Sequence, residues 1–237
     1  MSQNGAFTAD EMMAVEAARR LRDGTVCFVG IGLPSLAANL ARHTHAPNTV
    51  LIYESGTIGA KPTELPLSIG DGELAETADT VVSVPEIFAY WLQGRRIDVS
   101  FLGAAQIDRH GNLNSTVIGD YDHPTVRLPG GGGAPEIALG VDEVFVMLRH
   151  TPRAFVERLD FATSLGDNVR TVITDLAILE PRDGELTLVA THAGVAVEDV
   201  TAKTGWDLKV AADVRTTVPP SAEELGELRA LKTKGQS

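Results

Sequence analysis

The 237-residue chain has little of what several classes of protein require. Its single cysteine, Cys27, excludes a disulfide within the chain, and the apolar run around it is typical of a core strand. Acidic residues outnumber basic ones by 32 to 20, so the net charge of −12 argues against a nucleic acid partner. No apolar run approaches the roughly 20 residues that cross a bilayer, and the polar N-terminus lacks a signal sequence. We therefore expect a cytoplasmic protein.

Two kinds of catalytic site also lack support in the sequence. The six histidines are scattered, and His43 and His45 have no third ligand nearby, so we expect no metal site. The G-x-S-x-G motif of many serine hydrolases does not occur. The chemistry, if there is any, must come from other residues.

Apolar runs and turn residues predict an α/β fold with an open, mostly parallel sheet and flanking helices. In the first half, strands alternate with helices; the strands cover 25–29, 50–53 and 97–104, and the helices cover 9–23, 35–43 and 85–94. The second half has strand-like runs at 144–148, 169–173, 177–179 and 186–190. Asp183-Gly184 between the last two predicts a hairpin, so we expect some antiparallel pairing there.

The end of the chain has the pattern of an amphipathic helix over about 221–233. Ser221 and Glu224 have the spacing of a capping box at its start. No repeat or low-complexity segment divides the sequence. We therefore expect a single domain over residues 1–237.

One acidic residue stands at the end of an apolar strand. Residues 49–56 read T-V-L-I-Y-E-S-G, so the buried strand ends in Glu54 and turns at once through Ser55-Gly56. A structural protein would more often place a small or apolar residue there. A carboxylate at this position indicates a nucleophile or a general base.

Two glycine-rich segments could bind anions through their backbone. Gly30-Ile31-Gly32 lies between a strand and a helix, but it lacks the third glycine of a dinucleotide site and reads equally well as a tight turn. Residues 128–135 read L-P-G-G-G-G-A-P, and four consecutive glycines are costly to order. This second segment is either a flexible loop or an oxyanion hole made of successive N–H groups.

A third segment is rich in short amides and hydroxyls. Residues 103–116 read G-A-A-Q-I-D-R-H-G-N-L-N-S-T, with a turn predicted at His110-Gly111-Asn112. Neutral side chains such as Gln106 and Asn114 can orient a substrate without adding charge. The same composition also fits a polar hairpin that satisfies its own backbone.

Taken together, these segments resemble the B (β) subunit of family I CoA-transferases. The motifs G-I-G-L-P (30–34), Y-E-S-G (53–56), F-L-G-A-A-Q-I-D-R-H-G-N-L-N-S-T-V-I-G-D-Y (101–121) and R-L-P-G-G-G-G-A (127–134) occur in the family's order. Serine after the glutamate, together with F-V-E-R-L-D-F-A-T-S (155–164), is more similar to the glutaconate branch than to the 3-oxoacid branch. The resemblance implies the open α/β fold of this family, which is NagB-like.

The resemblance also implies a mechanism and a set of site residues. Glu54 would attack an acyl-CoA and then carry CoA as a glutamyl thioester, with ping-pong kinetics. Gly132, Gly133 and Ala134 would supply oxyanion donors, and Gly30 and Gly32 would shape the same cleft. Gln106 and Asn114 would position the substrate. No metal or other cofactor is implied, since the CoA thioester is itself a substrate.

The same resemblance implies that the chain is half of an enzyme. A homologous A (α) subunit would complete an active site at the interface, in an α2β2 or larger assembly. The acyl group stays open among glutaconate, 3-oxoadipate, other dicarboxylates and 3-oxoacids. Two alternatives also stay open: a relative that uses Glu54 as a base in hydrolysis, ring opening or decarboxylation of a CoA thioester, and a non-catalytic subunit that binds acyl-CoA.

Overall fold

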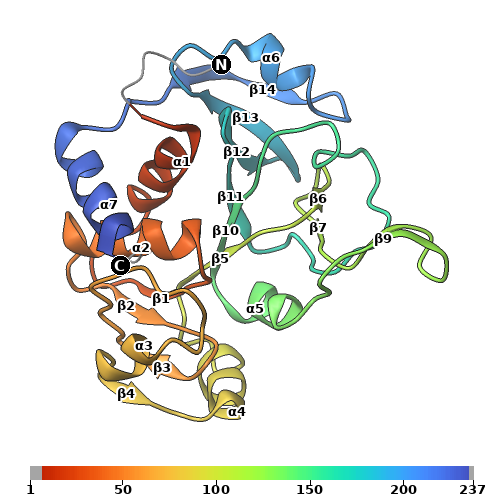
Figure 1. The fold of residues 1–237 in the computed structure, drawn as a ribbon. Helices are drawn as coiled ribbons and strands as arrows, with labels where there is room; N and C mark the ends of the chain where they lie inside the picture. The colour runs from red at the N-terminus through yellow and green to blue at the C-terminus, as the bar shows by residue number, and fades with distance from the viewer. Residues whose placement is uncertain (1–6, 235–237) are drawn as a thin grey trace. The chain divides into compact units, whose positions relative to one another are not determined.

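A computed structural model describes residues 7–234, with their side chains as far as residue 232 (Figure 1). The described chain clusters into two compact units. The first comprises residues 7–101, 140–142 and 220–234, and the second comprises residues 102–139 and 143–219. The expectation of a single domain over the whole chain stays a prediction. Among the described residues, no helix is both long and apolar enough to span a bilayer.

The strands of the first unit lie in the order β5, β1, β2, β3, β4, and they span Val99–Leu102, Val26–Phe28, Val50–Ile52, Thr57–Ile58 and Thr80–Val81. β1 pairs in parallel with both β5 and β2, as the alternation of strands and helices predicts. β3 and β4 are antiparallel additions that the sequence pattern does not reveal. They arise because the chain turns back sharply after β2 instead of entering a helix.

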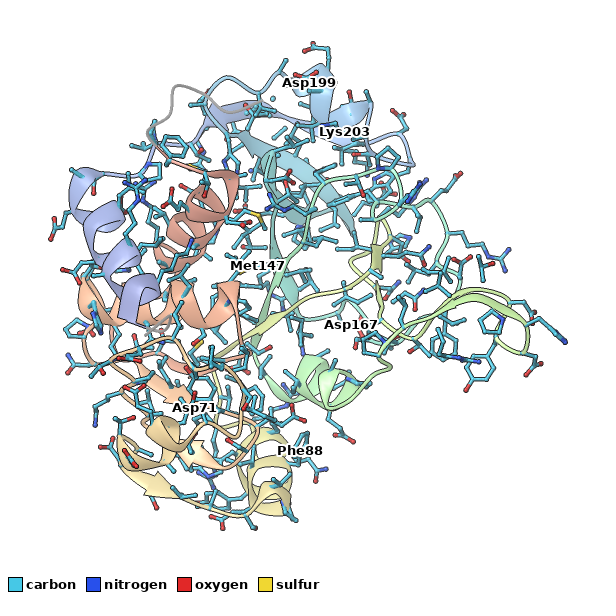
Figure 2. The ribbon with its side chains drawn as sticks, in the orientation of Figure 1. Asp71, Phe88, Met147, Asp167, Asp199 and Lys203 are labelled. Atoms are coloured by element: carbon cyan, nitrogen blue, oxygen red, sulfur yellow. The ribbon has the colours of Figure 1, made fainter. Side chains whose placement is uncertain are left out.

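The helices of the first unit are α1 (Ala9–Ala18), α2 (Leu33–His43), α3 (Gly72–Glu76), α4 (Val84–Glu86) and α7 (Ala222–Lys234). α1 ends earlier than the predicted residue 23, because the N–H groups of Arg20 and Leu21 bond carbonyls only three residues back. The segment predicted as one helix over 85–94 is α4 followed by a π-helix, Ile87–Leu92. The Asp71 side chain caps α3 by accepting the Glu73 N–H at 3.2 Å (Figure 2).

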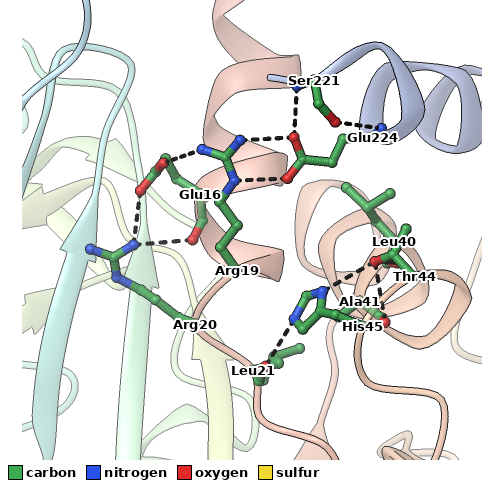
Figure 3. Close-up of polar contacts among 10 residues, drawn as sticks. All are labelled: Glu16, Arg19, Arg20, Leu21, Leu40, Ala41, Thr44, His45, Ser221 and Glu224. Atoms are coloured by element: carbon green, nitrogen blue, oxygen red, sulfur yellow. Dashed lines mark hydrogen bonds and ion pairs between the residues drawn. The ribbon is translucent and has the colours of Figure 1, made fainter. Parts of the chain in front are cut away.

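Ion pairs tie the two ends of the chain together within this unit (Figure 3). Arg19, the C-cap residue of α1, donates two hydrogen bonds to Glu224 of α7, at 2.7 and 2.8 Å, and a third to Glu16 at 3.0 Å. Glu224 also closes a capping box with Ser221 at the start of α7. A second pair joins Arg229 to the buried Glu11, and this hydrogen bond lowers the pKa of Glu11. α1, α2 and α7 therefore pack as one group (Figure 1).

The second unit has five strands in the order β10 to β14, which span Glu143–Met147, Val169–Ile173, Ala177–Arg182, Glu185–Thr191 and Lys209–Thr216. β10 pairs in parallel with β11, and β13 with β14, whereas β11, β12 and β13 are antiparallel. Asp183 and Gly184 both have positive φ, 51° and 80°, so the predicted hairpin turn is confirmed.

Two small hairpins complete the second unit. They pair β6 (Gln106–Ile107) with β7 (Leu113–Asn114), and β8 (Val117–Gly119) with β9 (Pro124–Arg127). The predicted turn at residues 110–112 joins β6 to β7 and is confirmed. Two short helices, α5 (Ala134–Gly140) and α6 (Val197–Thr201), precede β10 and β14.

Candidate functional site

Glu54 and the first glycine segment lie at the same edge of the first unit. β1 and β2 are parallel and in register, with Phe28 opposite Ile52, so the residues that follow each strand are neighbours. Gly30 follows β1, and Tyr53-Glu54 follows β2. The Val29 N–H donates to the Ile52 carbonyl at 2.9 Å, which extends the pairing to the start of both loops. The carboxyl edge of parallel strands is where α/β proteins commonly bind ligands.

A closed turn holds Glu54. The Gly56 N–H donates to the Tyr53 carbonyl at 3.0 Å, and the Tyr53 N–H donates to the Thr57 carbonyl at 3.0 Å, so Glu54 and Ser55 are the central residues of a tight turn. Gly56 has φ of 111°, and a Cβ there would collide with the Val82 carbonyl. Within the described chain, the half-buried Glu54 side chain forms no hydrogen bond or ion pair. Its carboxylate is therefore available to a ligand.

A buried polar network lies behind this turn. The phenol of the fully buried Tyr53 is 3.0 Å from the Ser35 hydroxyl on α2, and burial raises the pKa of Tyr53, which keeps the phenol protonated. Asn39 donates to the Ser35 carbonyl at 2.9 Å, and Arg42 donates to Asn39 at 3.3 Å. The network fixes the residue that directly precedes Glu54.

The sequence analysis missed this network, although its signal is visible in the chain. Ser35, Asn39 and Arg42 are spaced i, i+4, i+7, and this spacing places them on one face of α2. Ser35 and Asn39 are completely buried. Polar residues on a face that packs against a strand need partners, and a buried tyrosine on that strand is a suitable one.

The second glycine segment is anchored. The Gly130 N–H donates to the Ser115 carbonyl at 2.8 Å, and the Ser115 hydroxyl donates to the Gly130 carbonyl at 2.9 Å. The Ala134 N–H is already bonded to the Gly131 carbonyl at 2.9 Å, so it is less available as an oxyanion donor than predicted. In the described chain, the N–H groups of Gly132 and Gly133 have no such partner. These two remain the better candidates.

Gln106 and Asn114 lie together, as the hairpin predicts, but their polar groups are occupied. The Asn114 amide donates to Gln106 Oε1 and to the Val117 carbonyl, both at 2.7 Å, and its oxygen accepts the Thr116 N–H at 3.0 Å. The Gln106 amide donates to Asp160 at 3.0 Å. These contacts stabilise the β6–β7 hairpin, and substrate positioning by either residue stays a prediction.

Other reactive groups give no second candidate site. Cys27 is completely buried, and desolvation, with a smaller effect of Asp98, raises the pKa of its thiol, so the thiolate is disfavoured. Within the part of the chain that the structure describes, no three His, Cys, Asp or Glu residues are grouped to hold a metal ion. Glu54 is therefore the acidic residue with the strongest structural support for a chemical role.

Comparisons with known proteins bear on the family and the fold of this chain. The model of the coenzyme A transferase family matches residues 10–203. The B (β) subunit of 3-oxoadipate CoA-transferase from Pseudomonas knackmussii is 57% identical, over 97% of this chain and 95% of that protein. The corresponding subunit of glutaconate CoA-transferase from Acidaminococcus fermentans is 35% identical, over 91% and 89%. The crystal structure of glutaconate coenzyme A-transferase from that organism matches with a TM-score of 0.91 at 30% identity, over 99% of this chain and 98% of the other. The expected fold class is confirmed.

Proposed function

Because this chain belongs to the coenzyme A transferase family, we propose that it is the β subunit of a CoA-transferase with Glu54 as the nucleophile. The observation that carries the proposal is the unpaired carboxylate of Glu54, held in a closed turn at the carboxyl edge of parallel strands. A half-buried acidic residue with a purely structural role would more often have a partner within the chain.

The chemistry follows from this arrangement. A carboxylate oxygen of Glu54 attacks the acyl-CoA carbonyl, and the C–S bond breaks to give a mixed anhydride and CoA thiolate. The thiolate then attacks the side-chain carboxyl carbon (Cδ) of Glu54, which releases the first acid and leaves a glutamyl-CoA thioester. A second carboxylic acid reverses these steps and leaves as the new CoA ester. Donor and acceptor never meet, so ping-pong kinetics are expected.

Each of these steps passes through a tetrahedral oxyanion, which requires hydrogen-bond donors. The unpaired N–H groups of Gly132 and Gly133 are the donors that we assign to this role. Loss of one oxyanion donor typically costs about 3–4 kcal/mol of transition-state stabilisation. Gly30 and Gly32 leave the backbone beside Glu54 without side chains, and this supports our assignment of both to the substrate cleft.

We propose a dicarboxylic acid, with 3-oxoadipate first, as the acid that exchanges CoA. The name of the 57% identical relative supports this choice, and that of the glutaconate relative supports the wider class. We also propose that a homologous α subunit supplies the rest of the site in a cytoplasmic α2β2 or larger assembly, since both relatives are named as one of the subunits of their enzymes. No cofactor is needed besides the CoA thioester itself.

The test uses this chain copurified with its α subunit. The complex is incubated with 3-oxoadipyl-CoA or succinyl-CoA, treated with borohydride or hydroxylamine, and analysed by intact mass and peptide mapping. Modification at Glu54 is the expected result. Glu54→Ala should abolish the modification and lower kcat by at least about a thousandfold, since a nucleophile and its partners act as a unit. Glu76→Ala, which changes an exposed glutamate on α3, is the matched control.

Two outcomes would contradict the proposal. Release of free CoA without any modification of Glu54 would make Glu54 a general base and move the protein to the hydrolysing or decarboxylating members of the family. A Glu54→Ala complex that retains transfer within about tenfold of wild type would remove Glu54 from the chemistry altogether.

A further inference from the structure

Ser55 follows the proposed nucleophile directly and is the second central residue of the turn. Consecutive Cα atoms are about 3.8 Å apart, so the Ser55 side chain begins next to the Glu54 backbone. The hydrogen bond between Gly56 and Tyr53 closes the turn around both residues at 3.0 Å. The close approach of Gly56 to Val82 prevents the turn from opening on that side. Ser55 is thus presented on a rigid support.

The hydroxyl of Ser55 is buried without a partner. Its Oγ has no hydrogen bond in the described chain, although the residue as a whole is only half-buried. Serines in turns usually bond a nearby backbone group, and this one does not. An unsatisfied buried hydroxyl lowers stability, so the folded chain by itself gains nothing from this arrangement. The arrangement instead provides a donor for a group that arrives during the reaction.

We propose that the Ser55 hydroxyl is a catalytic donor to the oxygen that becomes negative on the carboxyl carbon (Cδ) of Glu54. The inference rests on the proposed function, because it requires Glu54 to become acylated. It places a side-chain donor on the nucleophile's own turn. It also gives the serine of the Y-E-S-G motif a chemical role.

The donor acts on two steps. When CoA thiolate adds to the carboxyl carbon (Cδ) of Glu54 in the mixed anhydride, a C–S bond forms and the carbonyl electrons move onto the oxygen. When these electrons return, the C–O bond breaks and the acid leaves. The same oxygen becomes negative again when the acceptor carboxylate attacks the glutamyl thioester and CoA thiolate departs. The Ser55 hydroxyl stabilises both states by hydrogen bonding and keeps its proton.

The experiment compares Ser55→Ala with wild type and with Ser100→Ala, each copurified with the α subunit. Ser100 is a suitable control because its hydroxyl is also buried and unpaired, but it lies within strand β5. Steady-state kcat, the rapid-quench rate of the borohydride-reducible Glu54 thioester, the complex's elution volume and its urea midpoint are measured. Ser55→Thr, which keeps a hydroxyl, serves as the conservative variant.

For Ser55→Ala we expect kcat and the rate of thioester formation to fall together by about ten- to a hundredfold. The urea midpoint should stay the same or rise, since an unsatisfied buried hydroxyl is lost. Ser100→Ala should keep both rates, and Ser55→Thr should recover part of them. Rates within twofold of wild type in Ser55→Ala would overturn the inference while leaving Glu54 catalysis intact.

Two other results can be distinguished from the outcomes described above. Full activity of Ser55→Ala at high α-subunit concentration, with a weaker complex, would show that the hydroxyl bonds the partner instead. Absence of a Glu54 thioester in the wild-type complex would refute the proposed function itself, and the inference with it.

Discussion

Replacing Gly56 by alanine tests whether the turn that holds Glu54 is as tightly packed as the structure shows. Gly56 has φ of 111°, which an L-residue rarely adopts. A new Cβ would also lie much closer to the Val82 carbonyl oxygen than 3.0 Å, a distance below which Cβ contacts essentially do not occur. The neighbouring segment cannot retreat freely, because the Val82 N–H bonds the Gly56 carbonyl at 2.9 Å. The change therefore combines backbone strain, overpacking and a weakened hydrogen bond.

The expected loss is about 2–6 kcal/mol of unfolding free energy. Left-handed backbone strain contributes about 1–2 kcal/mol, overpacking about 1–3 kcal/mol, and the weakened hydrogen bond about 1 kcal/mol at most. Gly24→Ala isolates the first of these contributions, because Gly24 has φ of 80° but no atom within 4 Å of a new Cβ. That control should lose only about 1 kcal/mol.

Urea unfolding of the full-length chain, followed by far-UV circular dichroism, measures both losses. Failure of Gly56→Ala to fold would itself agree with the larger loss, provided that Gly24→Ala folds normally. Equal midpoints for the two variants would refute the reasoning, since backbone strain alone would then account for Gly56. The turn would have room to move, and its rigidity could not be used to explain how Glu54 is presented.

Two further predictions concern ionisable groups away from the turn. Desolvation lowers the pKa of His150 to about 4, so between pH 6.5 and 4 the unfolded chain binds a proton that the folded chain does not. Stability should fall as the pH falls through this window, by about 3 kcal/mol from this residue, and His150→Phe should flatten the profile in urea titrations. An unchanged dependence of stability on pH in His150→Phe would contradict His150 as its cause. Arg19→Met should lower the free energy of unfolding by about 2 kcal/mol, because it leaves the carboxylates of Glu16 and Glu224 without their shared guanidinium. A loss of unfolding free energy below about 0.5 kcal/mol would show that water replaces the Arg19 guanidinium as the partner of these carboxylates.

Local chemistry explains which parts of the fold can be predicted from the sequence. The Asp183-Gly184 hairpin and the Ser221–Glu224 capping box each depend on residues that are adjacent or one helical turn apart, and the structure shows both. The strands β3 and β4 are two residues long, too short for a periodic pattern. The π-helix at Ile87–Leu92 keeps helical composition, so its different hydrogen bonding leaves no mark in the sequence.

The same distinction between local and long-range features applies to the candidate site. The position of Glu54 can be predicted from the sequence because an apolar strand, an acid and a glycine follow one another closely in the chain. Whether a polar group has a hydrogen-bond partner cannot be predicted in this way, because the partner can be far away in the sequence. Gln106 bonds Asp160, which is 54 residues away, and Ser35 bonds Tyr53, which is 18 residues away. Composition alone therefore does not tell which of these polar groups has a partner within the chain.

Hydrogen-bond capacity that the chain itself does not use is therefore the best guide to the chemistry. In the described chain, Glu54, Ser55 and the N–H groups of Gly132 and Gly133 retain such capacity, whereas Gln106, Asn114 and the Ala134 N–H do not. A buried unpaired group costs stability; in a turn a ligand can supply its partner, whereas the unpaired hydroxyl of Ser100 lies within strand β5. Substitutions in the first set should then affect turnover more than stability, and substitutions in the second set should do the reverse.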